Sequence, residues 1–198
     1  MMMMIRPKCI LRPGMVLTMC LLYAGAAQSA FEQRAVCARA IAMGGTFTAA
    51  QDDVGAIYWN PAALGTLSSS ELEFMYQDLY SKGLVNFTHL AFAYPGIGPG
   101  GFGISWTRYG VTKKVPFSYN ENTFTVGYGA SLPGRISAGA SFNYFKLKSE
   151  LNASGFGMNA GLQYRPFQWL CVGSAFSNVL KTNVRYEGGA TDTLPGNV

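Results

Sequence analysis

The chain has 198 residues, of which 49% are hydrophobic, 14% aromatic and only 13% charged, and it contains 24 glycines. The charged fraction is about half of the roughly 25% typical of soluble domains, which excludes a disordered chain or a coiled coil and argues against an ordinary water-soluble globule. The net charge of +5 falls to +2 when Arg6, Lys8 and Arg12 are set aside as part of a leader, so the charge indicates no nucleic-acid surface.

Residues 1–30 have the pattern of a secretory signal peptide. Three basic residues come first, an apolar run follows at 15–27, and small residues lie around 27–30. The apolar run is too short for a membrane-spanning helix, which needs about 20 residues. We therefore expect an exported protein that is either soluble in the periplasm or outside the cell, or crosses a membrane as strands.

The next segment, at 31–69, is rich in alanine and other small residues and shows no strand-like alternation. A Met-Gly-Gly sequence at 43–45 marks a flexible break, and the acidic pair at 52–53 could cap a short helix, which is a commoner role than a metal pair. Asn60 and Pro61 predict a second helix start, with asparagine as N-cap and proline as first helical residue. Such a segment could pack inside a confined lumen, and the alternative is an ordinary helical linker.

From residue 70 onward, strand-like segments alternate with turns. In the three clearest segments, at 123–130, 136–144 and 156–164, apolar side chains alternate with small or polar residues, so each strand has one apolar face. Less regular strands are expected at 71–77, 86–94, 101–109 and 169–177. We therefore predict seven strands of roughly 9–11 residues, a length that suits a tilted membrane strand.

Short and long connections alternate between these predicted strands. The short turns, marked by proline and glycine, lie at 95–100, 132–134 and 166–168, and the longer connections lie at 78–85, 110–121, 146–154 and from 178 onward. In an up-and-down meander, this alternation places all short turns at one end of the sheet. Transmembrane β-barrels of the outer membrane show the same asymmetry.

Aromatic residues near the predicted strand ends fit the interfacial girdles of such a barrel. They are Tyr128, Tyr144, Phe145, Phe156, Tyr164, Phe167 and Trp169. The alternative is a soluble β-sandwich with these rings in its core, but a sandwich would carry charge on its outer face, and mid-strand lysine and glutamate are almost absent. Because single-chain barrels have an even number of at least eight strands, seven strands indicate a fragment or a chain that needs partners, with an eighth strand beginning around 194–198.

A motif in the small-residue segment resembles the N-terminal signature of FadL-type outer-membrane transport proteins and of their PorV/PorQ branch. The matching residues are Ala38, Arg39, Met43, Gly44, Gly45, Asp52, Asp53, Asn60, Pro61 and Ala62. Asn178 and the pair Leu194-Pro195 give a weaker match to the tail of PorV/PorQ sequences. The chain departs from the pattern at Cys37, where the family often has glycine, and at Gln51, where it often has a small residue.

This resemblance implies an all-β fold, an antiparallel up-and-down transmembrane barrel of about fourteen strands with an N-terminal hatch in its lumen. The chain would comprise a signal peptide at 1–30, a hatch at 31–69 and the first half of the barrel at 70–198. In the hatch, the Asn-Pro-Ala motif would act as an anchor and the Met-Gly-Gly motif would supply mobility. The resemblance implies residence in the cell outer membrane, with outer-membrane lipid as a partner.

Enzymatic chemistry has little support in the sequence. The single histidine, His89, falls in a predicted strand and is expected at the surface or in a girdle, and one histidine assembles no Ser-His-Asp arrangement. The glycines at 96–103 lack the Lys-Ser/Thr of a phosphate loop. Cys37 and Cys171 could form a disulfide, although two free buried cysteines are favoured, and no Cys/His spacing predicts a metal. We expect neither an enzyme nor a cofactor.

Two functions fit these expectations. The first is passage of hydrophobic small molecules across the outer membrane, with the hatch closing the path. The second is a PorV-like part of a protein secretion or surface-attachment system, in which long loops bind secreted protein cargo. A soluble exported ligand-binding β-protein is a third alternative, which the asymmetric connections disfavour.

Overall fold

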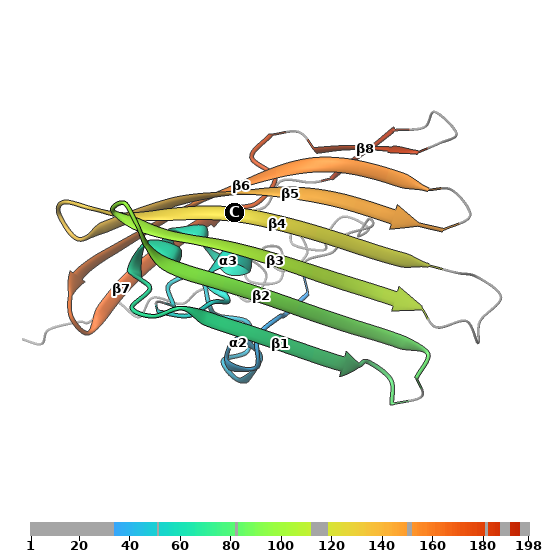
Figure 1. The fold of residues 1–198 in the computed structure, drawn as a ribbon, viewed down its shortest axis with the longest axis horizontal. Helices are drawn as coiled ribbons and strands as arrows, with labels where there is room; N and C mark the ends of the chain where they lie inside the picture. The colour runs from blue at the N-terminus through green and yellow to red at the C-terminus, as the bar shows by residue number, and fades with distance from the viewer. Residues whose placement is uncertain are drawn as a thin grey trace, which may run out of the picture.

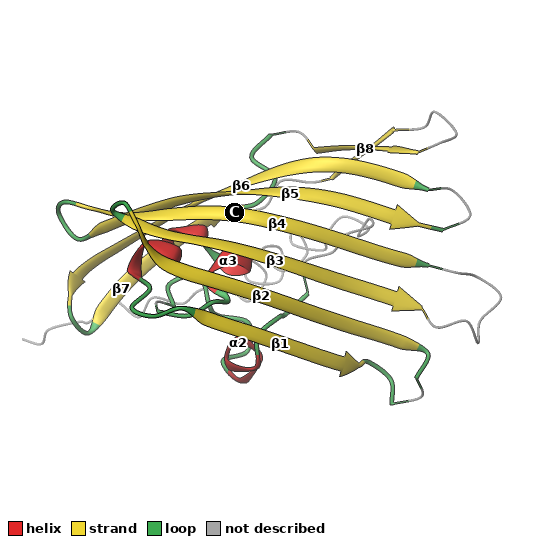
Figure 2. Ribbon diagram, in the orientation of Figure 1, coloured by secondary structure: helices red, strands yellow, loops and turns green. Residues whose placement is uncertain are grey.

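A computed structural model shows a broad, curled antiparallel sheet with short helices on its concave side (Figure 1). The structure describes residues 34–50, 52–81, 83–111, 119–149, 152–180, 182–186 and 191–194. The predicted signal peptide at 1–30 lies outside the described residues. The chain is all-β in class, as the prevalence of strand colouring in Figure 2 shows, and its sheet has the form of a half-barrel.

The helices come first along the chain: α2 (Ala38–Ala42), α3 (Ala56–Trp59) and the 3-10 helix η1 (Pro61–Thr66). Among the described residues, no helix combines the length and the apolar character that crossing a membrane requires. The strands are β1 (Glu71–Asp78), β2 (Val85–Ile97), β3 (Gly100–Val111), β4 (Asn120–Leu132), β5 (Ile136–Lys148), β6 (Ala153–Phe167), β7 (Leu170–Phe176), β8 (Thr182–Tyr186) and β9 (Thr191–Leu194).

Each strand from β1 to β6 pairs with its neighbour in the chain, which confirms the predicted meander. The three tight turns, β2 to β3, β4 to β5 and β6 to β7, gather at one end of the sheet, on the left of Figure 1. The strand ends that the other connections join, at Asp78 and Val85, Val111 and Asn120, and Lys148 and Ala153, lie at the opposite end. The predicted asymmetry of connections is therefore present, although the longer connections are shorter than expected.

The five strands β2 to β6 are longer than the predicted 9–11 residues, with 12 to 15 residues each, whereas β1 has 8 and β7 has 7. Two prolines that indicated turns lie inside strands. Pro95 and Pro166 each sit where the pairing register shifts, in β2 and β6 respectively. A proline is tolerated at a β-bulge because the bulge needs no ladder N–H there.

The predicted seventh strand, at 169–177, is present as β7, and the separate strand β8 follows it. β7 pairs with the half of β6 nearest the turn, and β8 pairs with the opposite end of the same β6 edge. Asn178 interrupts the run with a φ of 53°, and its backbone N–H donates to the Asn159 side chain at 3.0 Å. β9 then pairs with β8 and begins at Thr191, slightly before the place predicted for an eighth strand.

The alternation predicted for the strands is confirmed by their burial. On β4, Phe124, Val126 and Tyr128 face outward and are exposed, whereas Thr125 and Gly127 face inward and are buried. Phe145, expected in an outer girdle, instead faces inward and packs with Leu147, Ala153 and Val184. Successive side chains of a strand point to opposite faces, and the preceding residue, Tyr144, takes the outer face. The principal core lies between the inner face of the sheet and the segment before β1.

Candidate functional site

The N-terminal segment, defined here as residues 34–50 and 52–70, lies against the inner face of the sheet (Figure 2). η1 contacts the strands from β2 to β6, and its Leu64 is fully buried in a cluster with Ile57, Ala91 and Ala93. Burial of aliphatic side chains of this size contributes roughly 1.5–3 kcal/mol each. The segment is therefore held to the sheet by an apolar cluster as well as by polar contacts.

Asn60 is the polar centre of this attachment. It is 1% exposed, and its Oδ1 accepts a hydrogen bond from the Ala62 N–H at 3.1 Å, so it caps η1 as the sequence predicts. Its Nδ2 donates to three backbone carbonyls, those of Thr48 at 2.7 Å, Leu162 at 3.3 Å and Ser174 at 3.4 Å. The Asn60 side chain thus links the start of η1 to Thr48 earlier in the segment, to β6 and to β7.

Four glycines on neighbouring strands make room for this contact. Gly101, Gly129, Gly139 and Gly161 are paired one to the next across β3, β4, β5 and β6, and we call them the glycine row. A Cβ on each would meet an atom of the segment: Leu64 O at 2.4 Å, Pro61 O at 2.3 Å, Pro61 O at 2.3 Å and Asn60 Oδ1 at 1.9 Å, in that order. The glycine row is therefore a groove that receives the backbone of residues 60–64.

The inner face also binds the segment through Gln163. This side chain is 2% exposed, and its Nε2 donates to the carbonyls of Thr48 at 3.0 Å and Ala50 at 2.9 Å. On β7, a Cβ at Gly173 would meet the Thr48 carbonyl at 2.5 Å. The stretch around Thr48 is thus fixed by β6 and β7, beside the Asn60 contact.

The Met-Gly-Gly motif ends α2. Met43 is the C-cap, and Gly44 and Gly45 follow with φ values of 67° and 80°, a backbone conformation that favours glycine. The Gly45 N–H donates to the Ala40 carbonyl at 2.9 Å. The break expected from the sequence is thus a left-handed helix end.

The two aspartates do not cap one helix together, as the sequence suggested. Asp53 Oδ1 accepts from the Gly55 N–H at 2.8 Å just before α3, and its Oδ2 accepts from Arg39 at 3.2 Å. Asp52 instead binds Ser68, whose hydroxyl and N–H both donate to its Oδ1, at 2.7 and 2.8 Å. Asp52 therefore links the residues just before α3 to the residues just before β1.

The Asp52 contact predicts a pH dependence. The hydrogen bonds from the hydroxyl and the N–H of Ser68 lower the pKa of Asp52 below its ordinary value of 3.8. Since the folded pKa is the lower one, the contact stabilises fully above pH 3.8 and is lost as the pH falls through the lowered pKa. In an NMR titration of the Asp52 carboxyl carbon, we expect Ser68→Ala to move the midpoint upward. An unchanged midpoint would contradict this assignment.

A second group of polar side chains lies where α2 meets β1 and β2. It comprises Cys37, the N-cap residue of α2, with Glu73 on β1 and His89 on β2. Burial raises the pKa of the Cys37 thiol above its ordinary value, and the neighbouring Glu73 and Asp53 raise it further. The sequence placed His89 at the surface or in a girdle; this is wrong, because His89 faces inward beside Ala91 and is 0% exposed.

Both described cysteines are free, which agrees with the favoured alternative of the sequence. Cys37 is buried, but Cys171 on β7 is only half-buried. The spacing of residues 37, 73 and 89 matches no metal-binding motif, so their proximity could not be predicted from the sequence. Pairing of β1 with β2 does so, because Glu73 pairs with Ala91, the next inward position after His89.

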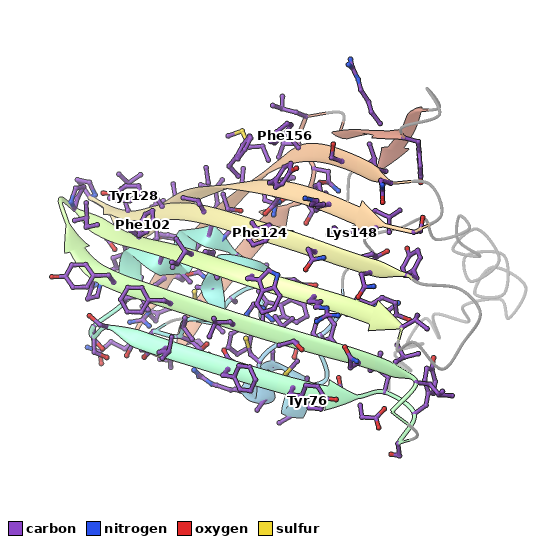
Figure 3. All side chains as sticks on the ribbon, turned by 45° about the vertical axis from the view of Figure 1, so that its right-hand side comes forward. Tyr76, Phe102, Phe124, Tyr128, Lys148 and Phe156 are labelled. Carbon is purple, nitrogen blue, oxygen red and sulfur yellow. The ribbon has the colours of Figure 1, made fainter. Side chains whose placement is uncertain are left out.

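The outer face of the sheet is apolar along most of its length. Figure 3 shows the labelled Phe102 and Tyr128 near the tight turns and Phe124 and Phe156 further along. The large exposed side chains on the strands include Leu72, Phe74, Leu90, Phe92, Ile104, Phe124, Val126, Phe142, Phe156, Leu162 and Val172. Contiguous exposed apolar patches on soluble monomers rarely exceed a few hundred Å². The apolar surface here extends over seven strands, from β1 to β7.

A polar row ends this apolar surface on the side of the longer connections. Its members are Arg108, Asn122, Lys146, Ser154 and Arg185, which are paired one to the next across β3, β4, β5, β6 and β8. An aromatic row of Trp106, Phe124, Tyr144 and Phe156 borders it in the same register. From Phe124 to Leu132 the apolar part of β4 is about 27 Å long, which a tilt of about 40° reduces to about 21 Å.

The sequence identified Asn60 and Pro61 and the two faces of the strands, but not the glycine row. Glycines alternate along each strand, and only the pairing register shows that four of them form one groove. Comparison of the chain with protein-family models, with curated proteins and with solved structures finds no match.

Proposed function

We propose that this protein is an outer-membrane β-barrel of the FadL and PorV kind that passes hydrophobic small molecules across the outer membrane. The single observation that carries the proposal is the outward apolar surface, bordered by the aromatic row and the polar row. Outer-membrane barrels have an apolar band about 25 Å tall between aromatic girdles, close to the height of this surface. In lipid both sheet edges must be paired, so the proposal requires strands beside β1 and β9.

Cell fractionation and heat-modifiable gel mobility test the membrane location. We expect the protein in the outer-membrane fraction, migrating faster before heating than after it. A soluble periplasmic product, with mobility unaffected by heating, would contradict both the barrel and its location.

The Val126→Arg substitution tests the lipid-facing surface. Val126 is 49% exposed on the apolar face, one outward position inside the aromatic row, and a charge on the lipid face of a barrel costs about 2–4 kcal/mol at the midplane and less toward the interface. We expect a lower urea midpoint for folding into detergent micelles or lipid vesicles. Lys146→Arg, on the same face but in the polar row, is the matched control and should leave the midpoint unchanged. Equal midpoints for Val126→Arg and wild type would contradict a lipid-facing role.

In this proposal the N-terminal segment is the hatch. Its firm attachment, at Asn60 and the glycine row, would hold residues 60–64 in place, whereas the left-handed turn of Gly44 and Gly45 would allow the part before it to move. Movement there would open a path beside the fixed part. Uptake of a labelled fatty acid by cells expressing the full-length gene tests this role. Uptake equal to that of an empty control, or of a protein lacking residues 34–59, would contradict it.

A part in protein secretion or surface attachment is the second candidate. The observation that favours it is the close contact of the segment with β3 to β7, which fills the inner face around Asn60. A closed inner face would suit a barrel that acts through its loops and passes no solute. Loss of secreted surface proteins in a deletion strain, without loss of fatty-acid uptake, would favour this candidate.

A further inference from the structure

Cys37, Glu73 and His89 form a compact set of metal-binding groups. The Cys37 sulfur, a Glu73 carboxylate oxygen and a His89 ring nitrogen all lie within 4.8 Å of one another. A tetrahedral zinc ion, with bonds of about 2.0–2.3 Å, holds its ligands roughly 3.5 Å apart. A modest convergence of three side chains would therefore bring all of them to bonding distance, with a fourth position left for water.

The orientation of His89 is the observation that points to a ligand. Its side chain is fully buried, and its Nε2 has no hydrogen-bond partner among the described residues. Its Nδ1 lies 3.0 Å from the Thr107 hydroxyl, which can accept a hydrogen bond from an Nδ1–H. That tautomer leaves the Nε2 lone pair free. Metal-bound histidines are oriented in this way, with the remote N–H held by a second residue.

The position of Cys37 is unusual for a residue of its kind. Its backbone φ is 72° with a ψ of 125°, a conformation that favours glycine and strains a cysteine. Room for its sulfur exists because the neighbouring residue is Gly55, where a Cβ would lie 2.5 Å from the Cys37 Sγ. A strained backbone and a small neighbour thus combine to place a thiol against Glu73 and His89.

The charges around the group are complementary to a cation. The negative charges of Asp53 and Glu71 lie close enough to Glu73 to interact with its carboxylate, and Asp53 also lies close to Cys37. The Ala38 N–H donates a hydrogen bond to the Glu73 carboxylate. Arg39 binds the Asp53 carboxylate at 3.2 Å. A reactive nucleophilic cysteine needs an electropositive, partly exposed setting, and Cys37, which is 2% exposed, has the opposite one.

We propose that Cys37, Glu73 and His89 bind a zinc ion that links α2 to the first hairpin of the sheet. The donor set, a thiolate, an imidazole and a carboxylate, suits zinc and disfavours calcium and magnesium, which prefer oxygen ligands alone. The bound ion would satisfy His89 Nε2. It would also fasten the first part of the N-terminal segment to β1 and β2, so the movement proposed for this part of the hatch would require the ion to leave.

Zinc binding by the full chain, without a histidine tag, tests this proposal. We expect the protein in detergent micelles to retain one zinc ion per chain after dialysis, and to bind cobalt with a thiolate-to-cobalt absorption band. Cys37→Ser and His89→Gln should each weaken zinc binding at least 100-fold in competition with a chelating dye. Thr107→Val, which removes only the orienting hydroxyl, should weaken it about 10-fold to 100-fold. Cys171→Ser is the matched control and should bind like wild type.

Two outcomes would overturn the proposal. The first is wild-type protein that holds no stoichiometric zinc, and the second is a Cys37→Ser protein that folds, as judged by its gel mobility, and binds zinc with wild-type affinity. If the variants fail to fold, alkylation of wild-type protein decides the question. Zinc should slow modification of Cys37 at least tenfold while leaving that of Cys171 unchanged, and equal rates with and without zinc would count against the site. Zinc binding does not require solute passage, so this result is independent of the uptake experiment.

Discussion

Replacement of Asn60 by aspartate should lower the free energy of unfolding by about 3–5 kcal/mol, the effect of an uncompensated buried charge. The substitution preserves the Oδ1 that caps η1 but replaces the Nδ2 donor by an acceptor, which would face the carbonyls of Thr48, Leu162 and Ser174. Asn60→Ala removes the cap and the donor without adding charge, and its cost should be smaller, about 2 kcal/mol.

Urea unfolding in detergent micelles measures both changes, and limited proteolysis reports whether the N-terminal segment has been released. Asn122→Asp is a suitable control, because Asn122 lies in the outer polar row and accepts a hydrogen bond from Trp106 Nε1 through an oxygen that aspartate retains. An Asn60→Asp protein as stable as the control would show that the amide of Asn60 does not hold the segment.

A methyl group in the glycine row should also release the segment. In Gly139→Ala the new Cβ would meet three backbone atoms, Pro61 O at 2.3 Å, Pro61 C at 2.4 Å and Ala62 N at 2.6 Å. Because backbone cannot rotate away, we expect a loss of about 3 kcal/mol, the upper part of the range for overpacking. Ala138→Val, on the outer face of the same strand, adds more volume and should have little effect.

Gly161 allows a sharper test of the same groove. Its added Cβ would lie 1.9 Å from Asn60 Oδ1, a side-chain atom that Asn60→Ala removes. In a double-mutant cycle, the Asn60→Ala/Gly161→Ala protein should therefore be more stable than the sum of the single changes predicts. The corresponding cycle between Asn60→Ala and Gly139→Ala should show no such gain. Additive effects in both cycles would contradict the arrangement of the groove.

Local patterns in the sequence were sufficient for the strands and their faces. A period of two assigns each side chain to one face without knowledge of the partner strand, so Phe124 and Val126 were correctly separated from Thr125. Asn60 and Pro61 were equally predictable, because an N-cap forms between residues adjacent in the chain. Prolines were misleading in β2 and β6, since a bulge, which depends on the partner strand, accommodates them.

Other features depend on which strands pair and in what register. Local patterns were enough to predict an antiparallel meander with one apolar face and a small-residue segment before it. The register of the paired strands was needed to show that Gly101, Gly129, Gly139 and Gly161 form one groove, and that His89 is buried beside Glu73 and Cys37. Contacts between residues far apart in the chain depend on which residues face one another across paired strands, and a local period does not encode that register.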